Sequence, residues 1–310
     1  MRKWHTVRNK AWLRALSYLI IVLVFYFLLK SLYQNWGNIA WSKLHFKLFY
    51  LLMSGTVVFL SYAISIYSWK LVLAEIGERV SYLQALKILG KSQLGKYLPG
   101  GIWMTASRLY LAEQEGLSKS RVLLASVVEQ EYVFVTALVL SILFLGFHGS
   151  LLELNLSGLN LLFLLLALLF LNPLSLTYLL KLGMRLFRLE YQNWRFGLRL
   201  YLILVLGYGI CWILQGLGFF LLAKSFYDLD LGWLKTFIGI YLSSWVIGFV
   251  AIFAPGGLGI REGSLALFLQ GSFPTGLAVS LSLLSRVWTT ILELLLFILA
   301  FIKKPEKPSN

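Results

Sequence analysis

Seven long apolar runs, separated by short polar or broken stretches, divide this chain of 310 residues. Each run is long enough to cross the hydrocarbon core of a bilayer, which is about 30 Å thick. The pattern predicts an all-α fold, a polytopic bundle of about seven or eight transmembrane helices. The runs cover roughly residues 15–33, 48–73, 121–147, 158–180, 199–223, 233–254 and 274–302.

Two shorter segments are not suited to cross the membrane completely. Residues 81–113 are amphipathic and contain Pro-Gly-Gly at 99–101, whereas residues 255–271 open with Pro-Gly-Gly at 255–257. Because proline and glycine end or bend helices, each segment predicts half-helices that enter the membrane and turn back, as discontinuous helices do in transporters. A shift of 156 residues superposes one Pro-Gly-Gly on the other, which indicates a weak internal repeat.

The distribution of lysine and arginine predicts the orientation. Residues 1–14 and 181–199 carry five basic residues each, which favours the cytoplasm, and 148–157 carries none, which favours the outside. The first run, 15–33, resembles a signal peptide, but no small-residue cleavage pattern follows, so we expect a retained helix. Lysines in the short polar tail, 303–310, favour eight crossings over seven.

The composition is that of an integral membrane protein. Hydrophobic residues make up 59% of the chain, mean hydropathy is +0.79, and charged residues are 13%, about half the usual share of a soluble domain. We therefore expect a single transmembrane domain over 15–302.

The net charge of +15 would suggest nucleic acid in a soluble protein. Here the basic residues cluster at segment ends, where they meet anionic lipid head groups, so we expect membrane lipids and no nucleic acid as partners.

The residue types that bind metals are scattered. Cys211 is the sole cysteine and lies in an apolar run, and the three histidines lie near segment ends. We therefore expect no internal disulfide, no metal site and no cofactor. Residues 89–96 contain Gly-Lys-Ser, but Ala85 stands where a phosphate-binding loop needs its first glycine, and no strand precedes it. This pattern does not indicate ATP hydrolysis.

An arginine follows each Pro-Gly-Gly. A helix that starts after such a break presents free N–H groups and a positive dipole end, and arginine holds phosphate through a bidentate fork. Glycine allows a ligand to approach the backbone closely. We therefore predict that both breaks face one shared anion, a phospholipid head group. The alternative is a pair of structural turns whose arginines reach the interface. The candidate substrate-binding residues on this argument are Pro99, Gly100, Gly101, Arg108, Pro255, Gly256, Gly257 and Arg261.

Four polar residues lie deep in two of the apolar runs. Glu129 and Gln130 are in the third run, and Arg286 and Glu293, seven apart and therefore on one helix face, are in the last. Glu131 points to a different face from Glu129. Ionisable groups at this depth usually face a cavity or a partner. A Glu129–Arg286 ion pair is one hypothesis, and such a pair could be purely structural.

Four stretches resemble the lysylphosphatidylglycerol synthase transmembrane-region family, whose members are called flippase-like. They are "GKYLPGGIWMTASRLYL", "LLASVVEQE", "APGGLGIREGSLALFL" and "LLSRVWTTILELLL". The resemblance extends over roughly 15–302 and includes the membrane half of multiple peptide resistance proteins. In those proteins an aminoacyl-transfer domain follows, and this sequence, which stops at Asn310, shows none. The resemblance therefore implies a lipid-translocating module rather than an aminoacyl transferase. Its motifs also imply that Trp103 and Glu262 belong to the candidate substrate-binding residues.

These observations together predict a flippase-like protein of the cell inner (plasma) membrane with a cytoplasmic N-terminus. It would bind or translocate an anionic polar lipid or a lipid-linked glycan. The alternative is an enzyme or enzyme subunit that acts on a lipid-linked substrate together with a partner glycosyltransferase. A translocator leaves its lipid chemically unchanged, and an enzyme releases a modified product.

Overall fold

A computed structural model describes residues 46–98, 102–145, 197–251 and 254–302, together with five single residues outside these ranges. Every regular element in the described part of the chain is helical, as the sequence predicts. Apart from single residues, the predicted runs 15–33 and 158–180 lie outside the described residues, as do the N-terminal residues 1–14, the loop 148–157 and the tail 303–310. The five single residues are Tyr26, Lys30, Tyr33, Tyr178 and Lys181.

Five helical segments are long and apolar enough to cross a membrane, and they coincide with five of the predicted runs. This makes the chain a multi-pass membrane protein. The long helices are α2 (Leu48–Glu75), α5 (Lys119–Leu145), α8 (Leu198–Phe226), α9 (Leu234–Val250) and α11 (Thr275–Ile302). Shorter elements connect them: α3 (Tyr82–Ser92), η3 (Gln93–Tyr97), α4 (Trp103–Gln114), η4 (Leu231–Trp233), η5 (Pro255–Gly257) and α10 (Ile260–Gln270).

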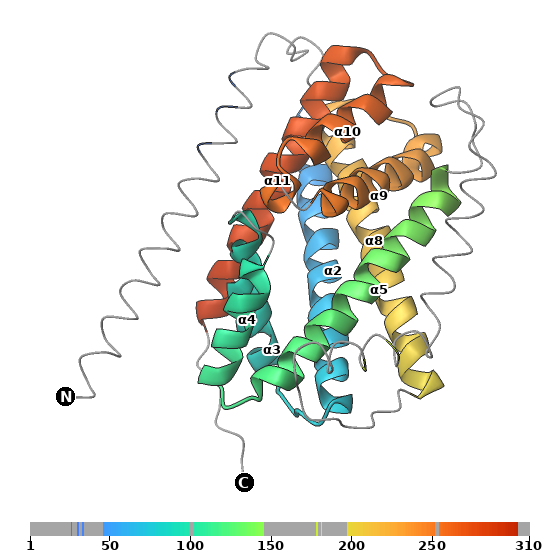
Figure 1. The fold of residues 1–310 in the computed structure, drawn as a ribbon. Coiled ribbons are helices and arrows are strands. Elements are labelled where there is room, and N and C mark those ends of the chain that lie inside the picture. The colour runs from blue at the N-terminus through green and yellow to red at the C-terminus, as the bar shows by residue number, and fades with distance from the viewer. Residues whose placement is uncertain are drawn as a thin grey trace.

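Helices α2 and α8 form the most extensive helix pair and run antiparallel (Figure 1). The backbone N–H of Lys47, just before α2, donates to the carbonyl of Ser225 near the end of α8 at 2.8 Å. Farther along, the Ser54 hydroxyl donates to the carbonyl of Gly218 at 2.7 Å. Such small residues let two helices approach closely where lipid provides no hydrophobic drive for association.

The segment α3–η3–α4 folds back on itself, with α3 and α4 in contact (Figure 1). A capping box starts α3, in which Ser81 and Gln84 exchange side-chain and backbone hydrogen bonds. The return is close because Gly95 has no side chain: a Cβ there would lie 2.8 Å from backbone atoms of Met104. The residues 99–101 of the first Pro-Gly-Gly lie outside the described residues.

A second unit, α9–η5–α10–α11, repeats the plan of α3–η3–α4–α5. A shift of 156 residues places α4 on 259–270 and α5 on 275–301, and the observed α10 and α11 cover Ile260–Gln270 and Thr275–Ile302. The repeat that is weak in the sequence is therefore clear in the helix boundaries.

The two units run in opposite directions. Helix α5 begins at the end of the bundle where Arg121 pairs with Glu78, and α11 ends there, with Ala300 against Gly90 of α3 (Figure 1). The breaks η3 and η5 are in contact with each other. The fold therefore brings two helix interruptions, η3 and η5, from distant parts of the chain to one place between oppositely directed helices.

Candidate functional site

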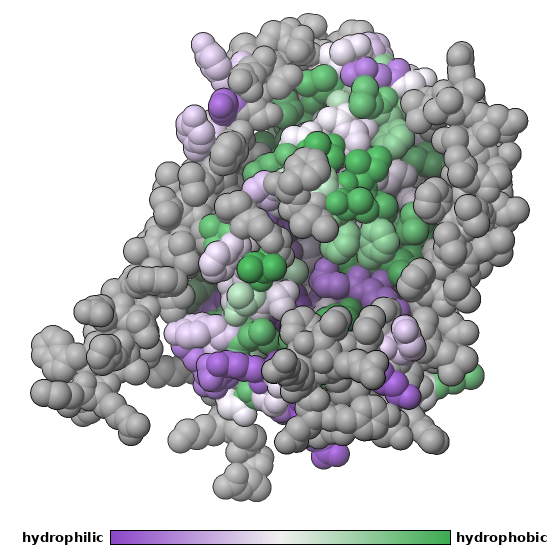
Figure 2. All heavy atoms as spheres, in the orientation of Figure 1, coloured by the Kyte–Doolittle hydropathy of each residue, from purple (hydrophilic) through white to green (hydrophobic). Residues whose placement is uncertain are grey.

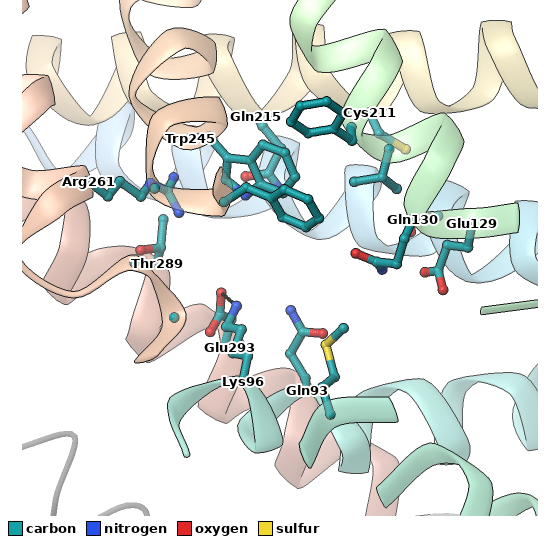
Figure 3. A pocket seen from close by; sticks show the side chains of 18 of the residues that line it. Gln93, Lys96, Glu129, Gln130, Cys211, Gln215, Trp245, Arg261, Thr289 and Glu293 are labelled. Carbon is teal, nitrogen blue, oxygen red and sulfur yellow. Dashed lines mark hydrogen bonds and ion pairs between the residues drawn. The ribbon is translucent and has the colours of Figure 1, made fainter. Parts of the chain in front are cut away.

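A cavity of about 720 Å³ opens where the two breaks meet. Its wall includes residues of the α3–η3–α4 segment, of η5 and of all five long helices. Hydrophilic and hydrophobic side chains meet in the middle of the face that Figure 2 shows, and Figure 3 shows the cavity from close by. Its volume suits a small molecule or the head group of a lipid.

Three ion pairs neutralise most of the charge around this cavity. Lys96 contacts Glu293 at 2.6 Å, Arg286 Nε lies 3.1 Å from Glu262, and Arg108 bonds to Glu129. A charge in an apolar interior requires a partner, because the desolvation of a charged group costs far more free energy than the desolvation of a neutral polar group. Within the described residues no group of three metal-binding side chains occurs.

The predicted Glu129–Arg286 pair is wrong. Glu129 is instead paired with Arg108, which projects from α4 and is only 2% exposed. Arg286 is paired with Glu262 in α10. The sequence hypothesis failed because it matched two long helices and did not consider that a short helix packed against each of them supplies the counter-charge.

Arg261 is the basic residue of the cavity wall that has no carboxylate partner among the described residues. Its guanidinium lies over the ring of Tyr241, 4.8 Å from the ring centre, and its Nη2 is buried without a hydrogen bond. The hydroxyl of Tyr241 donates to Gln215 at 3.1 Å, and Gln215 donates to Ser61 at 2.8 Å. This chain of contacts fixes the Tyr241 ring that supports Arg261, and leaves the guanidinium available to an anion.

The second break is shaped by left-handed glycines. Gly256 and Gly257 have φ of 58° and 71°, and both line the cavity. Arg286 Nη2 donates to the carbonyl of Gly256 at 3.1 Å, while Glu262 accepts a hydrogen bond from the N–H of Gly259 at 2.5 Å. The ion pair between Arg286 of α11 and Glu262 of α10, together with these two hydrogen bonds, therefore fixes the position of the second break relative to both helices.

Three residues predicted to contact a ligand have other positions. Trp103 is 42% exposed and does not line the cavity, and Pro255 and Glu262 are also absent from its wall. Gly257 does line the cavity, and the idea that it leaves room for a head group stays a prediction. A Cβ there would also meet the backbone of Gly248, 3.2 Å away. Gly257 therefore permits η5 to pack against α9, which is a role in helix packing.

Glu129, Gln130, Arg286 and Glu293 all line the cavity, whereas Glu131, two residues from Glu129, does not. This agrees with the expectation that polar groups at this depth face a cavity and that Glu131 points to a different face from Glu129. Arg108 also reaches the wall, but its charge is neutralised by Glu129. The burial of these charged groups follows from the packing of α4 and α10 against the long helices.

Several lining residues were missed by sequence reasoning. Gln215 and Trp245 are single polar or amphipathic residues within apolar runs, and Gln93 and Lys96 precede the first Pro-Gly-Gly (Figure 3). Burial lowers the pKa of Lys96, which lies outside the five long spans, and the carboxylate of Glu293 acts in the opposite direction. A polar residue inside an apolar run was the signal that could have identified Gln215.

The model of the family described as "Lysylphosphatidylglycerol synthase TM region" matches residues 14–296. The match extends over most of the chain, so this protein belongs to that family, as the sequence motifs indicate. It is a lipid-related membrane protein. No curated protein sequence matches the chain.

Proposed function

We propose that this protein binds an anionic polar lipid or lipid-linked glycan in the central cavity and moves it across the membrane. The observation that carries the proposal is Arg261, a half-buried residue of the cavity wall whose Nη2 is buried without a hydrogen bond and which has no carboxylate partner among the described residues. An uncompensated charge in an apolar environment is costly, and an anionic ligand supplies the missing partner. The free fork of the guanidinium matches phosphate oxygens.

The architecture supports translocation over static binding. We propose that α3–η3–α4 and η5–α10 are re-entrant, because each is too short to span and each returns towards its starting side. Transporters built from inverted repeats place their substrate site at the repeat interface, among broken helices, and alternate its access by rocking one unit against the other. The cavity wall here draws on both units, with Gln130 from the first and Arg261 from the second.

We also propose that the end of the bundle formed by the α2–α3 and α4–α5 connections faces the cytoplasm of a cell with this protein in its inner membrane. That end carries more basic residues than the other, as the positive-inside rule requires. Among the described residues, those at this end include Arg79, Lys87, Lys119, Arg121 and Arg199, against Lys47, Lys224 and Lys235 at the opposite end. A cytoplasmic N-terminus belongs to the same proposal.

The test is mass spectrometry of lipids that copurify with the protein, combined with a translocation assay in vesicles. We expect an anionic lipid with the wild type, its loss with Arg261→Ala, and nearly equal loss with Arg261→Lys, because lysine keeps the charge but has no bidentate fork. Arg79→Ala, which removes an exposed arginine far from the cavity, is the matched control. Full anionic-lipid binding by Arg261→Ala would overturn the proposal. A lipid released with an altered mass would favour an enzyme acting on it.

A further inference from the structure

One carboxyl group deep in α5 has no part in the cavity. Glu131 lies roughly 18 Å from one end of this helix and roughly 21 Å from the other, at 1.5 Å per residue. It is therefore close to the middle of the span. The preceding residues Glu129 and Gln130 extend into the cavity, whereas Glu131 is absent from the cavity wall (Figure 3).

The side chain of Glu131 is buried at its polar end. The residue as a whole is half-buried, but both of its carboxyl oxygens are buried, and neither has a hydrogen-bond partner. The residues about one turn away along α5 are all apolar, namely Val127, Val128, Phe134 and Val135. The environment that α5 itself provides for this carboxyl is therefore apolar.

The helices that pack against α5 provide no counter-charge. These are α2, α4, α8 and α9. Arg108 of α4 is paired with Glu129, and no ion pair joins Glu131 to any described residue. The other charged residues of the four helices are Lys70, Glu75, Glu113, Arg199, Lys224 and Lys235.

The titratable groups that act on this part of α5 are phenols. Tyr132 interacts electrostatically with Glu131 and with Tyr201 of α8, and the two tyrosine rings are 6.3 Å apart. A phenol is neutral at physiological pH and gives a carboxylate no compensating charge. Among the described residues, a negative charge on Glu131 would therefore be uncompensated.

The protonation state follows from the cost of desolvation. An ionised carboxylate without a counter-charge or a hydrogen bond loses its hydration and receives nothing in exchange. The neutral acid loses much less, so the present conformation favours a proton on one oxygen of Glu131. Glu129, two residues away, keeps its charge beside Arg108.

The position of Glu131 on α5 links this proton to the cavity. The same helix presents Glu129 and Gln130 to the cavity, so a movement of α5 that changes the shape of the cavity also changes the surroundings of Glu131. A conformation that exposes Glu131 to water favours the carboxylate. By linkage, a proton on Glu131 then favours the present conformation, and its loss favours the other.

We infer that Glu131 is a proton-binding site that couples the conformation of α5, and with it the cavity, to pH. The proton comes from water, binds one carboxyl oxygen and returns to water when α5 moves, and no other bond changes. The proton site stands on the geometry of α5 alone, whereas its coupling to transport rests on the proposed function.

The first test identifies the acid form by its chemistry in the wild-type protein. Dicyclohexylcarbodiimide is an apolar reagent that reacts with protonated carboxyl groups inside membranes. We expect peptide mass spectrometry to find its adduct on Glu131 at about pH 7, where an ordinary glutamate is ionised. The paired Glu129 and the exposed Glu113, which contacts Lys119, are the internal controls and should remain unmodified.

The adduct on Glu131 should decrease at about pH 9 and should be absent in Glu131→Gln. No adduct on Glu131 at any pH between about 6 and 9 would overturn the inference. Equal modification of Glu129 would also overturn it, because the missing counter-charge is what distinguishes the two residues.

The second test measures coupling. Vesicles that contain the protein receive a fluorescent short-chain phosphatidylglycerol, and extraction by albumin follows its movement between leaflets at equal internal and external pH. We expect the wild-type rate to differ by about fivefold or more between about pH 6 and about pH 9, a typical size for coupling between two sites. An unperturbed glutamate stays ionised over this whole range.

Glu131→Gln, which imitates the neutral acid, should move the lipid at the same rate at both pH values. Glu113→Gln removes an exposed carboxylate of α4 and should keep the pH dependence of the wild type. The same pH dependence in Glu131→Gln as in the wild type would overturn the coupling. If no form of the protein moves the lipid at either pH, the proposed function fails, and the adduct still decides whether Glu131 binds a proton.

Discussion

At the scale of single residues, buried charge is stabilised pair by pair. Arg108 and Glu129 are 2% and 5% exposed, and the guanidinium also donates to Ser126 at 3.4 Å and lies over the ring of Trp69. Removing one member of such a pair leaves a buried charge alone, whereas removing both leaves an apolar contact. The pair is thus a constraint on which substitutions α4 and α5 tolerate.

We predict that Arg108→Met and Glu129→Leu will each destabilise the protein by about 3–5 kcal/mol, and that the double variant will be much less destabilised. Thermal unfolding in detergent measures all three. If the two single losses simply add in the double variant, the residues do not act as a pair. Lipid binding in the double variant would separate this structural role from the anion binding that we assign to Arg261.

At the scale of helices, the second break depends on glycine for its backbone and its packing. Gly257 combines a φ of 71° with a contact to Gly248, so alanine there is strained and also too large. Gly263, in the middle of α10, has no neighbour within 4 Å of an added Cβ. The two glycines therefore lie in one segment, but only the position of Gly257 requires a residue without a side chain, whereas the position of Gly263 has room for one.

We predict that Gly257→Ala will destabilise the protein by at least about 1–2 kcal/mol, the usual cost of a left-handed conformation for an L-residue. Gly263→Ala should be neutral or should stabilise α10 by roughly 0.5–1 kcal/mol, because alanine restricts the unfolded chain. Thermal unfolding of the two variants side by side checks this. Equal effects at both positions would show that the break is not packed as we describe.

At the scale of the whole molecule, the orientation in the membrane can be tested at two exposed positions. Ser118 lies in the α4–α5 connection, where its backbone N–H donates to Glu78 at 3.2 Å, and Gly232 lies in η4 at the opposite end of the bundle. Cys211, the sole cysteine, is buried, so the wild-type chain should not react with a maleimide that cannot cross membranes.

We predict that Gly232→Cys is labelled in intact cells and that Ser118→Cys is labelled only after permeabilisation, because the end that contains Ser118 carries more lysine and arginine. A Cβ on Gly232 meets nothing within 4 Å, so that substitution should not disturb the fold. Labelling in the reverse pattern would invert the proposed orientation.

Much of the fold could be predicted from the local pattern of apolar and polar residues. The runs at 48–73, 121–147, 199–223 and 274–302 each became one long helix, because an apolar segment in lipid must satisfy its backbone within a helix. Polar residues in those runs, such as Glu129 and Glu293, marked the cavity because a buried charge requires a partner.

The sequence by itself determined that this is a helical membrane protein of its family, and it predicted two interrupted segments and ionisable groups inside the bundle. Only the tertiary structure decided which charges meet. Glu129 is paired with Arg108 and Arg286 with Glu262, so that Arg261 has no carboxylate partner in the described part of the chain. Hydrophobic periodicity is local and fixes where helices form, whereas charge pairing depends on how two inverted units pack, and no single helix encodes that arrangement.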